Sequence, residues 1–181
     1  GPARGLVGLV GRDDPRYARG MSLETIFSAA NGLALLGWLL LVFAPRWRFT
    51  DRLVLSGAFS LLLAALYLGL VIVYFGSSEG GFDSLAEVVK LFSHPPVVLI
   101  GWVHYLAFDL FIGAWELRDA RARGVPHLAL VPCLGLTLMF GPIGLLLYFA
   151  LRGLVESRLV RVWAGAAYAL LPGLTGLLLA R

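Results

Sequence analysis

The stretch PVVLIGWVHYLAFDLFIGAWELR, residues Pro96–Arg118, decides how this chain folds. At about 1.5 Å of rise per residue, its mostly apolar residues are enough to cross a bilayer as one helix. His104 and Asp109 nevertheless lie in its middle. An ionisable side chain near the bilayer centre costs about 3 kcal/mol or more unless it finds a partner or water. We therefore expect Asp109 to be buried against other helices of a bundle.

The composition is that of an integral membrane protein. Hydrophobic residues make up 59% of the 181 and charged residues only 14%, whereas soluble domains carry about 25% charge. The net charge is +4, but the basic residues are scattered through short loops and form no stripe of the kind that nucleic acid requires. We expect them to contact membrane lipids, and we expect no nucleic-acid partner.

Five long apolar runs predict an all-α fold, a polytopic transmembrane helical bundle of four to five spans. The runs are Glu24–Ala44, Leu53–Phe75, Pro96–Arg118, Pro126–Leu151 and Leu159–Ala180. Residues 1–20 are rich in glycine and arginine and lack an apolar core long enough for a signal peptide. We expect them to form a flexible or interfacial arm.

A short interfacial helix is expected between the second and third spans. Ser84 followed by Glu87 is a capping box, the pattern of a helix start. Apolar residues from Leu85 to Phe92 then recur at helical spacing. About ten residues cannot cross a bilayer, so the segment is either a connector on the membrane surface or a lid over a substrate entrance.

Loop charges bear on orientation in the cytoplasmic membrane. With four spans, one face carries Arg46, Arg48, Arg52, Arg118, Arg121 and Arg123, and the other carries Lys90, Arg152, Arg158 and Arg161. The positive-inside rule makes the first face cytoplasmic. The four arginines of residues 1–20 oppose this orientation.

Depth along the helices brings several polar groups to one level. Counted from the membrane face at which the first span begins, Asn31 lies about 10 Å deep, and His104 and Tyr67 about 12 Å. Asp109 is about 7 Å deeper than His104. Gly141 and Pro142 interrupt the fourth span near this level, and Pro142 has no amide hydrogen. The break is either a simple kink or a place where freed carbonyl groups meet a ligand.

His104 and Asp109 cannot form a hydrogen-bonded pair on their own helix. At roughly 100° per residue, Trp102, Tyr105 and Asp109 share one face with Glu116, while His104 lies on another. Each must find partners on other helices. The candidate partners are Asn31, Tyr67 and Thr137.

Known cofactor sites fit the sequence poorly. His127 opens the fourth span at the far membrane face, so it cannot face His104 across one haem. No pair of histidines or carboxylates has metal-ligand spacing on one helix face. We therefore expect neither a metal nor a cofactor.

What remains is an apolar, aromatic cavity with an acid and a histidine, which suits a long hydrophobic ligand with an oxygen function. The two groups either transfer protons or only pin helices together.

Several motifs together resemble one family. Trp102-Val-His104, Asp109-Leu-Phe111, Asp119 and Gly141-Pro-Ile-Gly144 are similar to the neoxanthin-synthase-like family, which comprises plant plastid membrane proteins named for abscisic acid deficiency and their bacterial relatives. The resemblance covers about Ser22 to Arg152. It implies a four-helix membrane domain over residues 21–152. The fifth apolar run lies outside the resemblance, and we expect residues 153–181 to form an additional C-terminal transmembrane helix.

The resemblance implies a carotenoid-like or isoprenoid ligand and a cofactor-independent isomerase that opens a carotenoid epoxide to an allenic alcohol. Such a reaction needs one acid and one base, and His104 and Asp109 are the candidate catalytic residues. The candidate ligand-binding residues are Asn31, Tyr67, Trp102, Tyr105, Phe108, Gly141 and Pro142. The alternative is a non-catalytic subunit that binds pigment or lipid within a larger membrane protein complex or homo-oligomer. The composition looks bacterial, so the plant substrate is not carried across.

Overall fold

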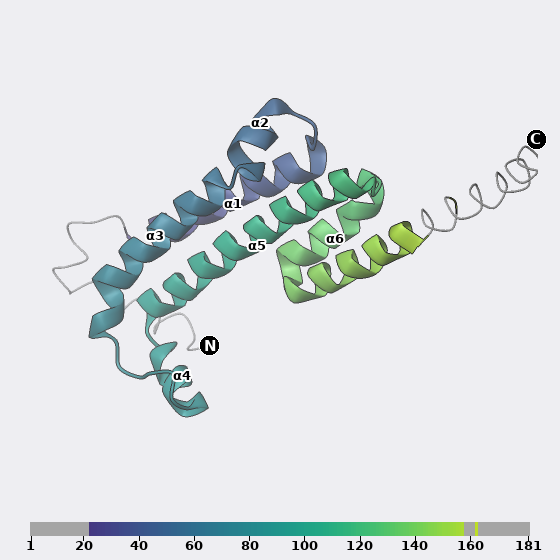
Figure 1. The fold of residues 1–181 in the computed structure, drawn as a ribbon. Helices are drawn as coiled ribbons and strands as arrows, with labels where there is room; N and C mark the ends of the chain where they lie inside the picture. The colour runs from purple at the N-terminus through teal and green to yellow at the C-terminus, as the bar shows by residue number, and fades with distance from the viewer. Residues whose placement is uncertain (1–21, 158–161, 163–181) are drawn as a thin grey trace, which may run out of the picture. The chain divides into compact units, whose positions relative to one another are not determined.

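The computed structural model of the chain describes residues 22–157 and residue 162, and all regular structure in them is helical (Figure 1). This confirms the predicted all-α class. The elements are α1 (Leu23–Phe43), α2 (Arg48–Thr50), the π-helical turn η2 (Asp51–Leu55), α3 (Ala58–Tyr74), the 3-10 turn η3 (Phe75–Ser77), α4 (Leu85–Leu91), α5 (Pro95–Arg123), α6 (His127–Phe140) and a helix over residues 142–157. The predicted arm, residues 1–20, and the predicted fifth span, apart from Val162, lie outside the described residues.

Three helical stretches are long and apolar enough to cross a membrane: Leu23–Phe43, Arg48–Tyr74 and Pro95–Arg123. Their lengths of 21, 27 and 29 residues meet the roughly 20 residues that a bilayer requires. Many of their large apolar side chains are exposed; Leu61 and Ile72 in α3 are 68% and 73% exposed. Such a surface suits lipid rather than water. The chain is therefore a multi-pass membrane protein.

The first three predicted spans are confirmed, with shifted ends. The second begins at Arg48, earlier than expected, and is interrupted at residues 56–57. The third continues beyond the expected end at Arg118 to Arg123. Arg123 Nε lies 2.9 Å from Asp119 Oδ2 in an ion pair at i,i+4 spacing, which supports a last helical turn.

The short helix between the second and third spans is confirmed as α4. Its N-cap is Ser84, whose hydroxyl accepts a hydrogen bond from the Glu87 amide at 3.3 Å. The seven residues of α4 are too few to cross a membrane. Leu85 is 80% exposed whereas Leu91 is buried, so the end of α4 is packed into the protein and its start is not.

Contacts divide the chain into two compact units. Unit 1 holds the described residues of Gly1–Gly37 and Ala58–Phe108, and unit 2 holds those of Trp38–Gly57 and Asp109–Arg181. Helices α1 and α5 each contribute residues to both units.

The predicted fourth span is wrong as a single helix. Helix α6 ends at Phe140, and the chain turns at Gly141 into the helix over residues 142–157. Figure 1 shows this second helix returning alongside α6. The 14 residues of α6 are too few for a full crossing. Unit 2 therefore contains a helical hairpin in place of a span.

The sequence of the turn explains the reversal. Gly141 has φ +26° and ψ −84°, a backbone conformation that side chains disfavour. Pro142 follows, has no amide hydrogen to continue α6, and fits the first position of a new helix. Gly144 then lets the two helices meet, because a Cβ atom there would lie 2.1 Å from the Thr137 amide nitrogen. The predicted backbone break is confirmed, and its consequence is a reversal of direction.

A methyl group at position 144 should destabilise the hairpin. Gly144→Ala places its Cβ against the Thr137 backbone, which cannot rotate away, and overpacking of this kind costs about 1–3 kcal/mol. The control is Gly153→Ala in the same helix, where no atom lies within 4 Å of the added methyl group. We expect thermal unfolding in detergent to show a lower Tm for Gly144→Ala and an unchanged or higher Tm for Gly153→Ala. Equal Tm values for the two variants would contradict the close approach.

Candidate functional site

Unit 1 contains a cavity of about 500 Å³. Its lining is mainly apolar and aromatic, and it includes His104. The aromatic side chains are Tyr67 from α3, Phe75 from η3, Phe82 from the loop before α4, Phe92 at the end of α4, and Trp102 from α5. Ligand sites commonly have this size, with apolar walls and a few polar groups. The cavity is therefore the candidate ligand site of unit 1.

Helix α5 supplies one wall of the cavity through its spacing. Val97, Ile100, Gly101 and His104 recur at i, i+3, i+4 and i+7, and so lie on one face of the helix. Gly101 makes room for the ring of Phe92, because a Cβ atom there would lie 2.8 Å from Phe92 Cε1. The absence of a side chain at position 101 thus shapes the cavity.

His104 lies between two aromatic rings. Its centroid is 5.5 Å from that of Tyr67 and 4.7 Å from that of Phe108. The side chain is exposed rather than buried in the protein. Within the described part of the chain, neither the His104 imidazole nor the Tyr67 hydroxyl has a hydrogen-bond partner. The predicted meeting of Tyr67 and His104 at one depth is confirmed, and both polar groups remain available to a ligand.

Asn31 holds Trp102 in place. The indole Nε1 of Trp102 donates a hydrogen bond to Asn31 Oδ1 at 3.1 Å, and Asn31 Nδ2 donates to the Phe27 carbonyl at 2.7 Å. The rings of Phe27 and Trp102 are 5.7 Å apart. On the other side of the indole, the ring of Tyr105 is 5.6 Å away. The Asn31 amide therefore positions one wall of the cavity from α1.

Asp109 has a different setting, in unit 2. A Cβ atom at Gly141 would lie 2.9 Å from Asp109 Oδ1, so the carboxyl group lies directly against the turn of the hairpin. Pro142, the next residue, is exposed. Asp109 is five residues after His104 on α5, which turns the two side chains about 140° apart. The structure thus brings Asp109 together with Gly141, and it does not pair Asp109 with His104.

Glu116 is a buried acid that the sequence reasoning did not select. It is 0% exposed, as is Thr137 in α6. Thr137 Oγ1 donates a hydrogen bond to Glu116 Oε1 at 2.9 Å, and Glu116 Oε2 is buried without a hydrogen-bond partner among the described residues. The sequence signal that could have identified Glu116 as buried is its spacing, because Glu116 lies seven residues after Asp109 on the same helix face. Glu116 was placed on this face in the sequence analysis and was given no role.

A cluster of ion pairs joins the end of α5 to the helix over residues 142–157. The Asp119 carboxylate accepts hydrogen bonds from the Tyr148 hydroxyl at 2.6 Å and from Arg123 Nε at 2.9 Å. The Glu156 carboxylate accepts one from Arg152 Nε at 3.1 Å and another from Arg123. Sequence reasoning could not anticipate the cluster, because it assigned residue 152 to the opposite membrane face.

Comparison with known proteins gives one family. No solved structure matches the chain. The chain is 23% identical over 143 residues to Protein ABA DEFICIENT 4, chloroplastic, of Arabidopsis thaliana; the match covers 75% of this chain and spans 64% of the length of that relative. A family model described as ABA DEFICIENT 4-like matches residues 25–148, which include most of α1, all of α3, α5 and α6, and the turn of the hairpin. This chain therefore belongs to the ABA DEFICIENT 4-like family.

Proposed function

We propose that the chain binds a carotenoid-like or isoprenoid molecule in the aromatic cavity of unit 1. The observation that carries the proposal is the cavity itself, about 500 Å³ in volume and lined by five aromatic side chains and His104. A conjugated hydrocarbon chain stacks favourably on aromatic rings. The Tyr67 hydroxyl and the His104 imidazole are the polar groups that would recognise an oxygen function on the ligand.

Family membership supports the same class of ligand. The sequence resemblance implies carotenoid chemistry. The family match over residues 25–148 includes every residue that lines the cavity. In the proposed isomerisation, one proton is added to the oxygen of a carotenoid epoxide and the carbon–oxygen bond breaks. A second proton leaves a carbon of the polyene chain and an allenic alcohol forms. The ligand gains and loses no atoms or electrons overall.

His104 is the proposed proton donor or acceptor in the cavity, because its imidazole is available there and can serve either role. Asp109 is the second group proposed to transfer a proton. Its carboxyl group lies against the hairpin turn at Gly141 and does not line the aromatic cavity, so it requires a separate substitution. The alternative function, binding a pigment without converting it, is favoured by the small number of polar groups in the cavity. Binding alone needs only the aromatic walls.

Filling the cavity should weaken ligand binding. Gly101→Val adds a branched side chain where Phe92 already lies 2.8 Å from a Cβ position, so the ring must move into the cavity. The control is Gly69→Val in α3, where nothing lies within 4 Å. We expect the Kd for an epoxide carotenoid, measured by tryptophan fluorescence quenching in nanodiscs, to rise about tenfold or more for Gly101→Val. It should change little for Gly69→Val. Unchanged binding in both variants would place the ligand elsewhere.

Removing the imidazole should stop conversion while leaving the pigment bound. His104→Phe keeps an aromatic ring of similar shape, so we expect turnover to fall by about a hundredfold or more with pigment retained. Pigments extracted from membranes of a carotenoid-producing host, separated by chromatography, give both readings. His94→Phe is the control, because His94 precedes α5 and does not line the cavity.

Asp109→Asn is the matched test of the acid, since it keeps the shape of the side chain beside Gly141. Wild-type turnover in both His104→Phe and Asp109→Asn would remove these residues from catalysis. A wild-type protein that retains pigment and never converts it would favour the alternative function.

A further inference from the structure

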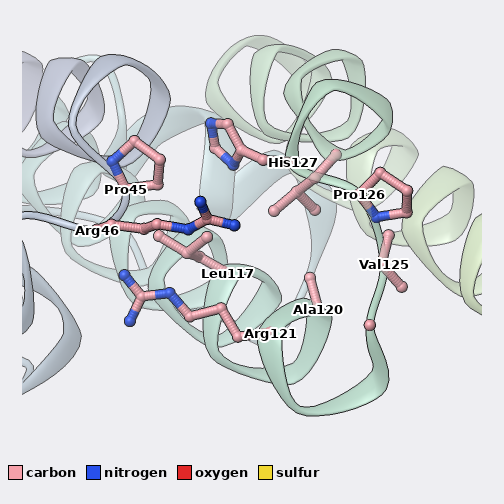
Figure 2. Close-up of a pocket in the computed structure, with 10 residues that line it drawn as sticks. Pro45, Arg46, Leu117, Ala120, Arg121, Val125, Pro126 and His127 are labelled. Carbon is pink, nitrogen blue, oxygen red and sulfur yellow. The ribbon is translucent and has the colours of Figure 1, made fainter.

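Unit 2 contains a second cavity, of about 480 Å³, that shares no residue with the aromatic cavity. It lies among the loop after α1, the last turns of α5 and the start of α6. Its polar lining comes from Arg46, Arg121 and His127, and its apolar lining includes Leu117, Val125 and Leu130. Figure 2 shows the two guanidinium groups and the imidazole around the same space. The cavity combines a cationic side with an apolar side.

The cavity holds more positive than negative charge. Arg121 Nη1 lies 2.7 Å from Asp51 Oδ1, and this pair is partly exposed. Arg46 makes no ion pair or hydrogen bond with any other residue of the described chain. One carboxylate thus faces two guanidinium groups. Guanidinium groups bind phosphate through parallel N–H donors, so an anion with several oxygens would balance the charge.

The start of α6 adds further donors. His127 Nε2 lies 2.8 Å from the Val42 carbonyl oxygen and donates to it, which fixes the ring beside α1. His127 Nδ1 is buried and lacks a hydrogen-bond partner among the residues described. No side chain caps the helix, because its N-cap residue is Pro126. The free amides at a helix start carry partial positive charge and favour anions. His127, the first residue of α6, lines the same cavity as Arg46 and Arg121.

The surroundings are those of a membrane interface. Helix α1 ends at Phe43 and helix α5 at Arg123, each within a few residues of the cavity lining. In the loop after α1, the exposed rings of Trp47 and Phe49 contact each other at 4.8 Å, and Arg48 lies over the Phe49 ring. Exposed aromatic and basic residues at a helix end are typical of the headgroup level. Basic pockets between membrane helices at this level bind anionic lipid headgroups.

We propose that this cavity binds the phosphate group of an anionic phospholipid. Arg46 and Arg121 hold the phosphate oxygens, the start of α6 faces the same group, and Leu117, Val125 and Leu130 contact the glycerol and the first carbons of the acyl chains. A lipid is favoured over free phosphate because the apolar side of the cavity continues into helices that are themselves exposed to lipid.

Native mass spectrometry of the full chain, purified with mixed phosphatidylglycerol and phosphatidylcholine, tests the site. We expect wild-type protein to retain phosphatidylglycerol in preference to phosphatidylcholine. Arg46→Gln should reduce that retention about fivefold, as expected for one basic contact with an anionic lipid. Arg46→Glu, at the same exposed loop position, should reduce it further. The control is Arg48→Gln, which removes the same charge two residues later, at the start of α2, where the side chain does not line the cavity.

Three results would overturn the proposal. Equal retention of the two lipids by wild-type protein would show that the cavity does not select for charge. Equal losses of phosphatidylglycerol retention in Arg46→Gln and Arg48→Gln would show that the lipid responds to surface charge in general and not to this cavity. A rise in Tm with inorganic phosphate alone, as large as that with phosphatidylglycerol, would make the ligand a soluble anion. Circular dichroism of each variant establishes that the helices are intact.

Discussion

Three carboxyl groups on one side of a membrane-spanning helix constrain the whole of unit 2. Asp109, Glu116 and Asp119 lie within about 80° of one another around α5. Acids at membrane depth are costly unless protein groups surround them. The hairpin supplies those groups, because Gly141 lies against Asp109 and Thr137 donates to Glu116. A second lipid-facing helix could not have covered all three acids so closely without the turn at Gly141.

The two units use α5 for different purposes. In unit 1 its side chains form an aromatic wall, and Trp102 donates a hydrogen bond to Asn31. In unit 2 the same helix contributes acids that bind α6 and the helix after it. His104, in the unit 1 part of α5, has no hydrogen-bond partner among the described residues, whereas Asp119, in the unit 2 part, accepts hydrogen bonds from Tyr148 and Arg123. Because the two parts of α5 belong to different units, one helix contributes both an aromatic wall and a set of structural carboxylates.

Most of the fold follows from local patterns, and part of the site follows from depth. Apolar length located the first three spans, and the Ser84 capping box located α4. Counting 1.5 Å per residue correctly placed Tyr67 beside His104. The reversal at Gly141 was not predictable from length or hydropathy, because an apolar run of 26 residues fits one span as well as a hairpin. Glu116 was not selected because its hydrogen bond with Thr137 joins two helices, and a contact between helices is not visible in the spacing along either one.

The hairpin also determines the sidedness of the chain. A fourth crossing would have carried Arg152 to the opposite leaflet from Arg123, dividing the arginines between the two faces. Instead Arg152 Nη1 lies 3.5 Å from Asp119 Oδ2, and Glu156 pairs with Arg123. Arg152 therefore lies with Arg123 at the end of α5. Positive charge concentrated at one end of a set of membrane helices is the kind of asymmetry that sets the orientation of a membrane protein.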